Sequence, residues 1–374
     1  MIHRSSRLLL NEKGSGFQVT CERTESYAIL IESPFVPELV ELLAGIRDSL
    51  DCGSVYVVTD ALAAGTAGQV AEAAEAVGLE VLGRSVLDGA EAGKSEAAVT
   101  GLWSDLSAAG TLRRTVVVGV GGGVVCDVVG FVAATYMRGV PYVLVPTTLM
   151  AQVDAAIGGK TGFNHGGQKN LVGGFAHPSG VVIDPALLAE LPDRVLAGGV
   201  AEIAKVGIIG HSGLFAALEA STFDDLRHDL DRIHEIVRIS VAEKLRHLAA
   251  DPVEVGDLRR VLNFGHCVGH AVEAEVGYSW LHGECVAVGI AVATRVSHAL
   301  GLVRPAEAQR VYGLLDQYQL PQHVPAEYAD RVWVHLSRIS RVRNGPLHLV
   351  VPREIGRVEV LTDWPGDVSW EEVY

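Results

Sequence analysis

Histidines in the second half of the chain have a spacing that suits metal binding. His266 and His270 stand four residues apart in the run LNFGHCVGHAVEAE, and His282 follows in SWLHGE. A helix would place the first two imidazoles on one face, where they can share Zn²⁺. Cys267 occupies the position that the general-base glutamate holds in HExxH metalloproteases, which disfavours that class. Because paired helical histidines are more often ordinary surface or core residues than ligands, the spacing alone leaves both interpretations open.

A glycine run could bind a nucleotide. Residues 119–127 read GVGGGVVCD, between a β-branched run and a helical pattern. Backbone N–H groups and the helix dipole at such a junction bind pyrophosphate. Val124 replaces the last glycine of the GxGxxG pattern, so close packing of a strand against a helix is an equal alternative.

A second glycine-rich segment, residues 146–170, carries Asp154, Lys160, Lys169 and Asn170. Ammonium groups neutralise a phosphate dianion, and glycine lets backbone amides approach it. A phosphate ester is therefore the favoured ligand, with a solvated surface loop as the alternative.

A carboxylate and an ammonium share a helix face further along the chain. In GGVAEIAK, Glu202 and Lys205 stand three residues apart. By itself this spacing indicates an ordinary solvated ion pair. Each of these patterns is weak in isolation, and only their order along the chain makes them informative.

The elements that position these residues change character halfway along the chain. Up to about residue 185, β-branched runs such as SVYVVTD and RRTVVVGV alternate with helical patterns at 61–77 and 95–109. This alternation predicts βαβ units in a mostly parallel sheet, preceded by an edge hairpin at 17–32. From about 197 to 320 the apolar positions recur at i, i+3 and i+4, which predicts helices, and LHLVVPREIGRVEVL predicts a hairpin. We expect an α/β domain at 1–185 and a mostly α-helical domain at 186–374.

Composition narrows the class of protein. The 374 residues include 30 basic and 45 acidic ones, a formal net charge of −15, which disfavours nucleic acid and anionic membranes as partners. An anionic substrate would need a local basic pocket. Five cysteines without CxxC spacing indicate neither a disulfide framework nor a thiolate zinc site. Without an uncharged apolar run of about 18 residues that could span a membrane, we expect a cytoplasmic enzyme.

Taken in order, the motifs resemble the 3-dehydroquinate synthase family of sugar-phosphate cyclases. The resemblance covers roughly residues 89–290. It implies an N-terminal Rossmann-like NAD-binding domain with a mostly parallel sheet, a C-terminal α-helical metal-binding domain, an active site in the cleft between them and a homodimer. The matching segments are DGAEAGKS, GGGVVCDVVGFVAATYMRG, VPTTLMAQVDAAIGGKTGFN, GQKNLVG, LPDR, GVAEIAK, DLRRVLNFGHCVGHAVE and LHGECVAVG.

The resemblance also implies a role for each matching residue. The ligands of a divalent metal, Zn²⁺ or Co²⁺, would be Glu202, His266 and His282. Contacts to NAD would come from Asp60, Glu91, Lys94, Gly121, Gly122, Gly123, Asp127, Thr147, Thr148 and Lys169. The catalytic residues would be Asp154, Lys160, Lys205, Lys244, Arg259, Asn263 and His270. Asn170 would bind the substrate, and Arg138 would reach the phosphate pocket of a neighbouring subunit.

The implied reaction is that of a carbon–oxygen lyase. NAD⁺ oxidises a secondary alcohol of 3-deoxy-D-arabino-heptulosonate 7-phosphate (DAHP), the new ketone acidifies the adjacent C–H, and phosphate leaves. The hydride then returns, and ring opening with an intramolecular aldol closure gives 3-dehydroquinate. NAD is therefore recycled.

Departures from the family pattern keep the substrate open. SRISRVRNGPLHLV places Ser340 and Arg341 where the family has lysines. The alternatives are an amino-dehydroquinate synthase or a sedoheptulose 7-phosphate cyclase of the 2-epi-5-epi-valiolone synthase type, both from secondary metabolism. Sedoheptulose cyclases usually have aspartate in place of Asn263 and lack His270, so dehydroquinate ranks first. An NAD- and metal-dependent alcohol or polyol dehydrogenase and a paralogue that binds without turnover are the other candidates.

Overall fold

The computed structural model describes residues 3–13, 16–253, 261–277, 279–342, 347–364 and 368–374. The chain forms two compact units. The first unit comprises the described residues up to Pro146 together with Gly159–Phe163 and Val172–Asp184. The second comprises Thr147–Gly158, Asn164–Leu171 and the described residues from Pro185 onward. No helix within the described ranges is long and apolar enough to cross a membrane.

A six-stranded parallel sheet forms the core of the first unit. Its strand order is β3-β10-β7-β6-β4-β5, and every neighbouring pair is parallel. All residues of β6 and β7 are buried, as expected for strands covered on both faces. The predicted mostly parallel sheet is confirmed. Its strands are β3 (Ala28–Ile31), β4 (Ser54–Asp60), β5 (Glu80–Leu87), β6 (Thr115–Gly121), β7 (Tyr142–Pro146) and β10 (Gly180–Ile183).

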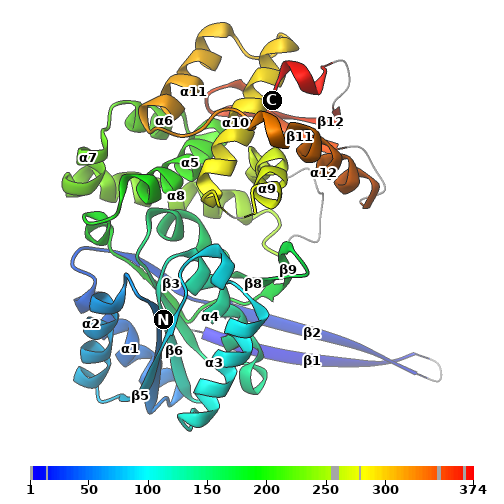
Figure 1. Cartoon of the computed structure of the whole chain (residues 1–374). Coiled ribbons are helices and arrows are strands. Elements are labelled where there is room, and N and C mark those ends of the chain that lie inside the picture. The colour runs from blue at the N-terminus through cyan, green and yellow to red at the C-terminus, as the bar shows by residue number, and fades with distance from the viewer. Residues whose placement is uncertain (1–2, 14–15, 254–260, 278, 343–346, 365–367) are drawn as a thin grey trace. The chain divides into compact units, whose positions relative to one another are not determined.

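Helices cover both faces of this sheet. Helices α1 and α2 lie on one side of the strands, and α3 and α4 lie on the other (Figure 1). This arrangement follows from right-handed crossovers, because the chain moves across the sheet in one direction up to β5 and in the other afterwards. Their bounds are α1 (Val36–Leu50), α2 (Ala64–Ala76), α3 (Glu96–Ala108) and α4 (Gly123–Thr135).

Two hairpins of the chain differ from the sequence expectations. The segment 17–32 is not a hairpin by itself, because β2 (Gly16–Ser26) pairs antiparallel with the preceding β1 (His3–Lys13) and the following β3 joins the parallel sheet. The lysine-bearing segment expected as a loop contains the two-stranded sheet of β8 (Lys160–His165) and β9 (Gln168–Phe175). Gly166 and Gly167 connect these strands with φ of 59° and 76°, angles that favour glycine.

The second unit is mostly helical, as predicted. Helix α10 is central to it, and most of its residues are buried. The predicted hairpin is present as β11 (Leu347–Glu354) and β12 (Arg357–Trp364). The helices are α5 (Asp193–Gly210), α6 (Ser212–Glu219), α7 (Phe223–His228), α8 (Leu230–Leu248), α9 (His266–Glu275), α10 (His282–Ala299), α11 (Pro305–Gln317) and α12 (Ala329–Val342).

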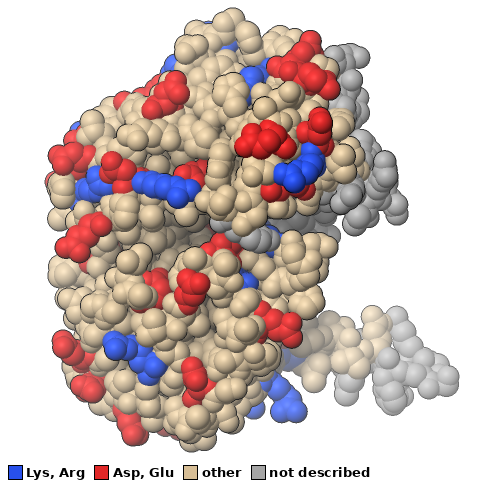
Figure 2. Space-filling view, viewed as in Figure 1, with Lys and Arg blue, Asp and Glu red and all other residues tan. Residues whose placement is uncertain are grey.

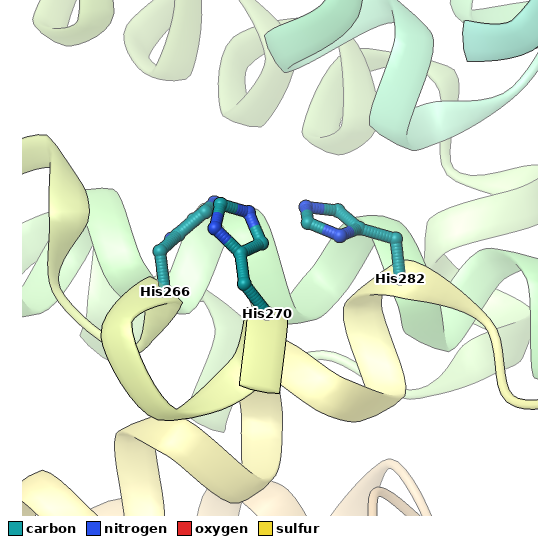
Figure 3. Close-up of side chains that lie close together, drawn as sticks. All are labelled: His266, His270 and His282. Carbon is teal, nitrogen blue, oxygen red and sulfur yellow. The ribbon is translucent and has the colours of Figure 1, made fainter. Parts of the chain in front are cut away.

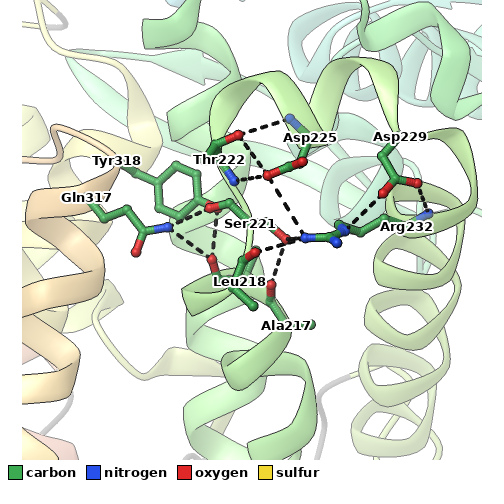
Figure 4. A network of polar contacts seen from close by, with 10 residues as sticks. Ala217, Leu218, Ser221, Thr222, Asp225, Asp229, Arg232, Gln317 and Tyr318 are labelled. Carbon is green, nitrogen blue, oxygen red and sulfur yellow. Dashed lines mark hydrogen bonds and ion pairs between the residues drawn. The ribbon is translucent and has the colours of Figure 1, made fainter.

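A polar network fixes the start of α8 (Figure 4). Thr222 and Asp225 form a capping box at α7, and the Asp229 carboxylate caps α8 by accepting a hydrogen bond from the backbone N–H of Arg232. From the end of α11, the Tyr318 hydroxyl donates to the carbonyl oxygens of Leu218 (3.0 Å) and Ser221 (2.7 Å). The network therefore positions the helix that carries Lys244.

Charged side chains of both signs are scattered over the visible surface. Figure 2 shows acidic and basic groups interspersed among uncharged ones, without a large basic field on that face. This agrees with the net charge of −15. Within the described residues, Lys205 and Lys244 of the second unit are instead buried.

Candidate active site

Glycines let three helices of the second unit come into backbone contact. A Cβ atom at Gly283 of α10 would lie 2.2 Å from the carbonyl oxygen of Gly198 in α5. A Cβ atom at Gly289 would lie 1.8 Å from the carbonyl oxygen of Gly265, which precedes α9. Any larger residue would push these helices apart. Glu202, His266 and His282 lie within four residues of Gly198, Gly265 and Gly283, so these contacts bring the three side chains together.

Glu202, His266 and His282 converge from these three helices. Glu202 is 1% exposed, and its Oε1 atom lies 3.5 Å from Nε2 of His266 and 3.5 Å from Nε2 of His282. Two ligands held about 2.1 Å from a tetrahedral ion would be about 3.4 Å apart. Within the described residues, the buried Oε1 atom accepts no hydrogen bond. One carboxylate and two imidazoles are the donor set of catalytic zinc sites, so the geometry fits a divalent cation.

His270 lies beside the other two imidazoles. Its ring centroid is 5.2 Å from that of His266 and 5.8 Å from that of His282. One nitrogen from each of the three rings lies within 4.8 Å of the others. Figure 3 shows the three imidazoles facing one another, with His266 and His270 from α9 and His282 from the start of α10. His270 is exposed, which suits a group that contacts a substrate.

Buried ions of alternating sign extend from Glu202. Lys205 is 2% exposed, and its Nζ atom lies 2.5 Å from Oε2 of Glu202 and 3.7 Å from Oδ1 of Asp154. The Nζ atom of Lys244 lies 2.8 Å from the same Asp154 oxygen and donates to the Asp154 carbonyl. Asp154 belongs to a π-helical turn, Ala151–Ala155, a geometry that is frequent at functional sites. The structure thus brings together four predicted site residues.

The neighbouring charges keep these buried groups ionised. Burial opposes ionisation of Glu202, but Lys205 and the two histidines hold the pKa of its carboxyl well below the usual range. Burial likewise opposes ionisation of Asp154, and Lys244 and Lys205 hold its pKa low. Burial would lower the pKa of Lys205, but Glu202 and Asp154 raise it. Glu202 and Lys205 do form an ion pair, but it is buried, so the ordinary solvated pair that the spacing alone indicated is not what the structure contains.

Glu273, which the sequence reasoning missed, completes the opposite side of the centre. This α9 residue is 1% exposed, and its Oε2 atom lies 3.2 Å from Nδ1 of His282. Its Oε1 atom accepts a 2.5 Å hydrogen bond from Nζ of Lys169, which itself lies 3.3 Å from Nδ1 of His282. The sequence feature that could have identified Glu273 is its position seven residues after His266, on the same helix face.

The two imidazoles that face Glu202 differ in charge. Burial and the nearby Lys205 ammonium lower the pKa of His266 to about 4. Burial and Lys169 also act to lower the pKa of His282, but the Glu273 and Glu202 carboxylates outweigh them and raise it to about 8. At neutral pH, His266 is therefore neutral and the metal-free His282 is protonated.

Several residues expected to contact NAD gather at the ends of strands in the first unit. The Asp60 carboxylate, at the end of β4, accepts hydrogen bonds from the backbone N–H groups of Leu62 (2.9 Å), Ala63 (3.0 Å) and Gly122 (3.3 Å). Gly121 ends β6, Gly122 caps α4 and Gly123 begins it, so the N–H groups that have no acceptor within the helix lie at this turn. Asp60 therefore ties two neighbouring strand ends together.

Lys94 and Asp127 form an ion pair in the same unit. Lys94 is 2% exposed, and Asp127 lies in the first turns of α4. Glu91 lies in a short 3₁₀ turn, Glu91–Gly93, just before Lys94. Lys160 is exposed at the start of β8, and the exposed Arg138 lies in a tight turn with a φ of 66°. Contacts of these residues with NAD or substrate stay predictions.

The remaining expected residues belong to the second unit. Thr147 and Thr148 follow β7, and the Thr148 hydroxyl accepts a hydrogen bond from Ala151. The backbone N–H of Asn170 donates to the Asn164 side chain, and Asn263 is half-buried in a 3₁₀ turn. Arg259 and the side chains of Ser340 and Arg341 lie outside the described residues, so their roles stay predictions.

Comparisons with known proteins agree over nearly the whole chain. A family model described as 3-dehydroquinate synthase N-terminal matches residues 84–198, and one described as 3-dehydroquinate synthase C-terminal matches residues 199–338. The 2-epi-valiolone synthase of Stigmatella aurantiaca is 41% identical over 371 residues, covering 96% of this chain and 91% of that protein. The 3-dehydroquinate synthase of Symbiobacterium thermophilum is 39% identical over 350 residues, covering 92% and 97%.

A solved structure has the same fold. ValA, a 2-epi-5-epi-valiolone synthase from Streptomyces hygroscopicus subsp. jinggangensis 5008, superposes with a TM-score of 0.84 and 30% sequence identity. The match covers 95% of this chain and 97% of that chain. The structure of ValA has NAD⁺ and Zn²⁺ bound.

Proposed function

This chain belongs to the 3-dehydroquinate synthase family, and from that premise we propose that it is a phosphate-eliminating sugar-phosphate cyclase that uses NAD and a divalent metal. The observation that carries the proposal is the buried Glu202 oxygen, 3.5 Å from one nitrogen of each of two imidazoles. The NAD⁺ and Zn²⁺ in the similar ValA structure support the choice of cofactors.

Glu202, His266 and His282 would hold the cation. When bound, a divalent cation lowers the pKa of a substrate hydroxyl and stabilises negative charge on its oxygen, and NAD⁺ accepts and later returns a hydride. Lys205 keeps Glu202 ionised and in place through its 2.5 Å contact. Its ammonium has three N–H groups, so at least one is left to donate to a substrate oxygen.

The leaving group requires cationic partners. Once the adjacent alcohol is a ketone, the neighbouring C–H loses its proton, the C–O bond to phosphate breaks, and phosphate leaves with the bonding electrons. Lys160, Asn170, Asn263 and the exposed His270 would neutralise or hydrogen-bond the phosphate, and a phosphate oxygen or His270 would take the proton. Lys244 holds Asp154 in position through its 2.8 Å contact.

We place DAHP first among the substrates. Asn263 and His270 match the dehydroquinate side of the family, and Arg259 with Lys160 would bind the DAHP carboxylate. Sedoheptulose 7-phosphate is the second candidate, because relatives named for valiolone products are 41% and 30% identical to this chain. Ser340 and Arg341, in place of two lysines, also favour a change of substrate.

A substrate panel tests the proposal. The purified protein, supplied with catalytic NAD and Zn²⁺ or Co²⁺, is offered DAHP, its amino analogue, sedoheptulose 7-phosphate and glucose 6-phosphate. We expect one phosphate released for each DAHP consumed, a product with the mass of 3-dehydroquinate, and no net NADH. Phosphate release from sedoheptulose 7-phosphate alone would overturn the DAHP assignment. NADH formed in step with turnover, without phosphate release, would overturn the cyclase in favour of a dehydrogenase.

A further inference from the structure

We propose that Glu273 is a positioning residue that fixes the metal-binding tautomer of His282 and neutralises Lys169 beside it. The inference rests on the proposed function only in taking His282 as a metal ligand. Glu273 is 1% exposed, and its two oxygens contact different partners, Oε2 with Nδ1 of His282 at 3.2 Å and Oε1 with Nζ of Lys169 at 2.5 Å. Such a carboxylate–histidine pair behind a metal ligand orients the imidazole and raises its basicity.

The tautomer follows from the geometry of the ring. Nε2 of His282 faces Glu202, so this nitrogen must offer its lone pair to a cation there. The proton of the neutral ring then resides on Nδ1 and needs an acceptor. Among the residues that the structure describes, two groups lie within 3.3 Å of Nδ1; the Lys169 ammonium has no lone pair, so the Glu273 carboxylate is the one of these two that can accept. Glu273 is therefore the acceptor that holds His282 in its ligating form.

The Glu273 carboxylate also neutralises the Lys169 ammonium. Its Nζ atom lies 3.3 Å from Nδ1 of His282, so without a counter-charge it would donate to this nitrogen and leave the proton on Nε2. An ammonium at this distance would also repel a cation bound to the ring. The ion pair with Glu273 removes both effects. It also links the centre to a lysine that the sequence assigned to NAD or phosphate binding.

Metal affinity of the metal-free protein is the direct test. Zn²⁺ binding is measured by competition with a chromophoric chelator, and Co²⁺ binding by its visible absorption, without NAD or substrate. We expect Glu273→Gln to weaken Zn²⁺ binding by about 10- to 100-fold, the usual effect of losing such a partner. Glu273→Asp keeps the charge and should lose less. Glu275→Gln is the matched control, because Glu275 is in the same helix but contacts Arg331 and His335, and its Zn²⁺ affinity should equal that of the wild type.

The Lys169→Met variant separates positioning from a purely structural role. Removing the ammonium should leave Zn²⁺ affinity equal or higher, and Lys169→Met combined with Glu273→Gln should recover part of the loss, a coupling that independent sites do not show. If Glu273→Gln proves unfolded by circular dichroism, Glu273→Asp and Lys169→Met carry the test, and a tenfold weaker affinity in Lys169→Met overturns the proposal. Wild-type affinity in folded Glu273→Gln also overturns it. Zn²⁺ binding as expected without phosphate release would instead refute only the cyclase.

Discussion

Charged groups are arranged differently at the glycine turn (residues 121–123) of the first unit and at the proposed metal centre (Glu202, His266 and His282) of the second. Beside the turn, Lys94 forms an ion pair with Asp127, and the Asp60 carboxylate accepts hydrogen bonds from backbone N–H groups. Around the proposed metal centre, ammonium, carboxylate and imidazole groups form a continuous series in which most members contact two charged or imidazole neighbours. Its members are Lys244, Asp154, Lys205, Glu202, His266, His282, Glu273 and Lys169.

The difference concerns what each arrangement can bind. The series contains three lysines and three carboxylates, so these charges cancel and a divalent cation would give the centre a net positive charge for an anionic substrate. A turn lined by backbone N–H groups binds an anion such as pyrophosphate with little help from side-chain charge. Removal of one charged side chain should therefore disturb its neighbours throughout the proposed metal centre, whereas at the glycine turn the effect should stay local.

Removal of the shared carboxylate should give the largest effect. Glu202→Gln replaces an anionic ligand by a neutral amide in contact with Lys205 and two histidines. We expect the variant to lose bound zinc on dialysis and phosphate release to fall by about a thousandfold or more, because the cation contributes several kcal/mol. Metal analysis and a phosphate assay check this. Full zinc content in Glu202→Gln would contradict its role as a ligand.

Two buried lysines give the next test. In the metal-free protein, Lys205→Met should lower the free energy of unfolding by about 3–5 kcal/mol, because two carboxylates lose a shared partner. Lys94→Met should cost less, about 1–3 kcal/mol, because the Asp127 side chain is 18% exposed and can be hydrated. Urea denaturation measures both. Equal losses would show that the two arrangements do not differ.

The pH dependence of metal binding should follow His282. With a pKa of about 8 in the metal-free protein, this histidine is protonated at neutral pH and must release a proton to bind a cation. His266, with a pKa of about 4, releases none. Zn²⁺ affinity should therefore rise about tenfold per pH unit from pH 6 to 8 and then level off. Calorimetry in two buffers would detect the released proton, and a flat affinity over this range would contradict the assignment.

Glycine substitutions should have effects on stability no larger than that of Lys94→Met. In Gly283→Ala the new Cβ meets a backbone oxygen at 2.2 Å, so α5 and α10 must separate, whereas in Gly121→Ala it meets side-chain atoms of Asp60 and Val125 at 2.6 Å. We expect each substitution to lower the free energy of unfolding by about 1–3 kcal/mol, and only Gly283→Ala to weaken Zn²⁺ binding. Thermal unfolding and zinc titration distinguish them. Weakened zinc binding in Gly121→Ala would contradict the separation of the two sites.

The sequence by itself determined the alternation of strands and helices, the change of period near residue 185 and the family. These features are visible without knowledge of three-dimensional contacts. β-branched runs such as Thr115–Gly121 indicate buried strands, and the order of the motifs along the chain indicates the family. It also indicated His266 and His282 as candidate ligands. It placed the N-terminal hairpin wrongly, because strand pairing depends on which segments meet and not on alternation alone.

Only the tertiary structure decided which charges share a site. The spacing of Glu202 and Lys205 alone indicates a solvated pair, and nothing local distinguishes Glu273 from other helical glutamates. Burial depends on packing against helices that are distant in the sequence. Contacts of Gly283 with Gly198 and of Gly289 with Gly265 bring α5, α10 and the start of α9 together, and the Glu202 and Glu273 carboxylates are buried beside the same imidazole. Burial strengthens the interactions between these charges, and pairs of residues far apart in the chain then set their ionisation.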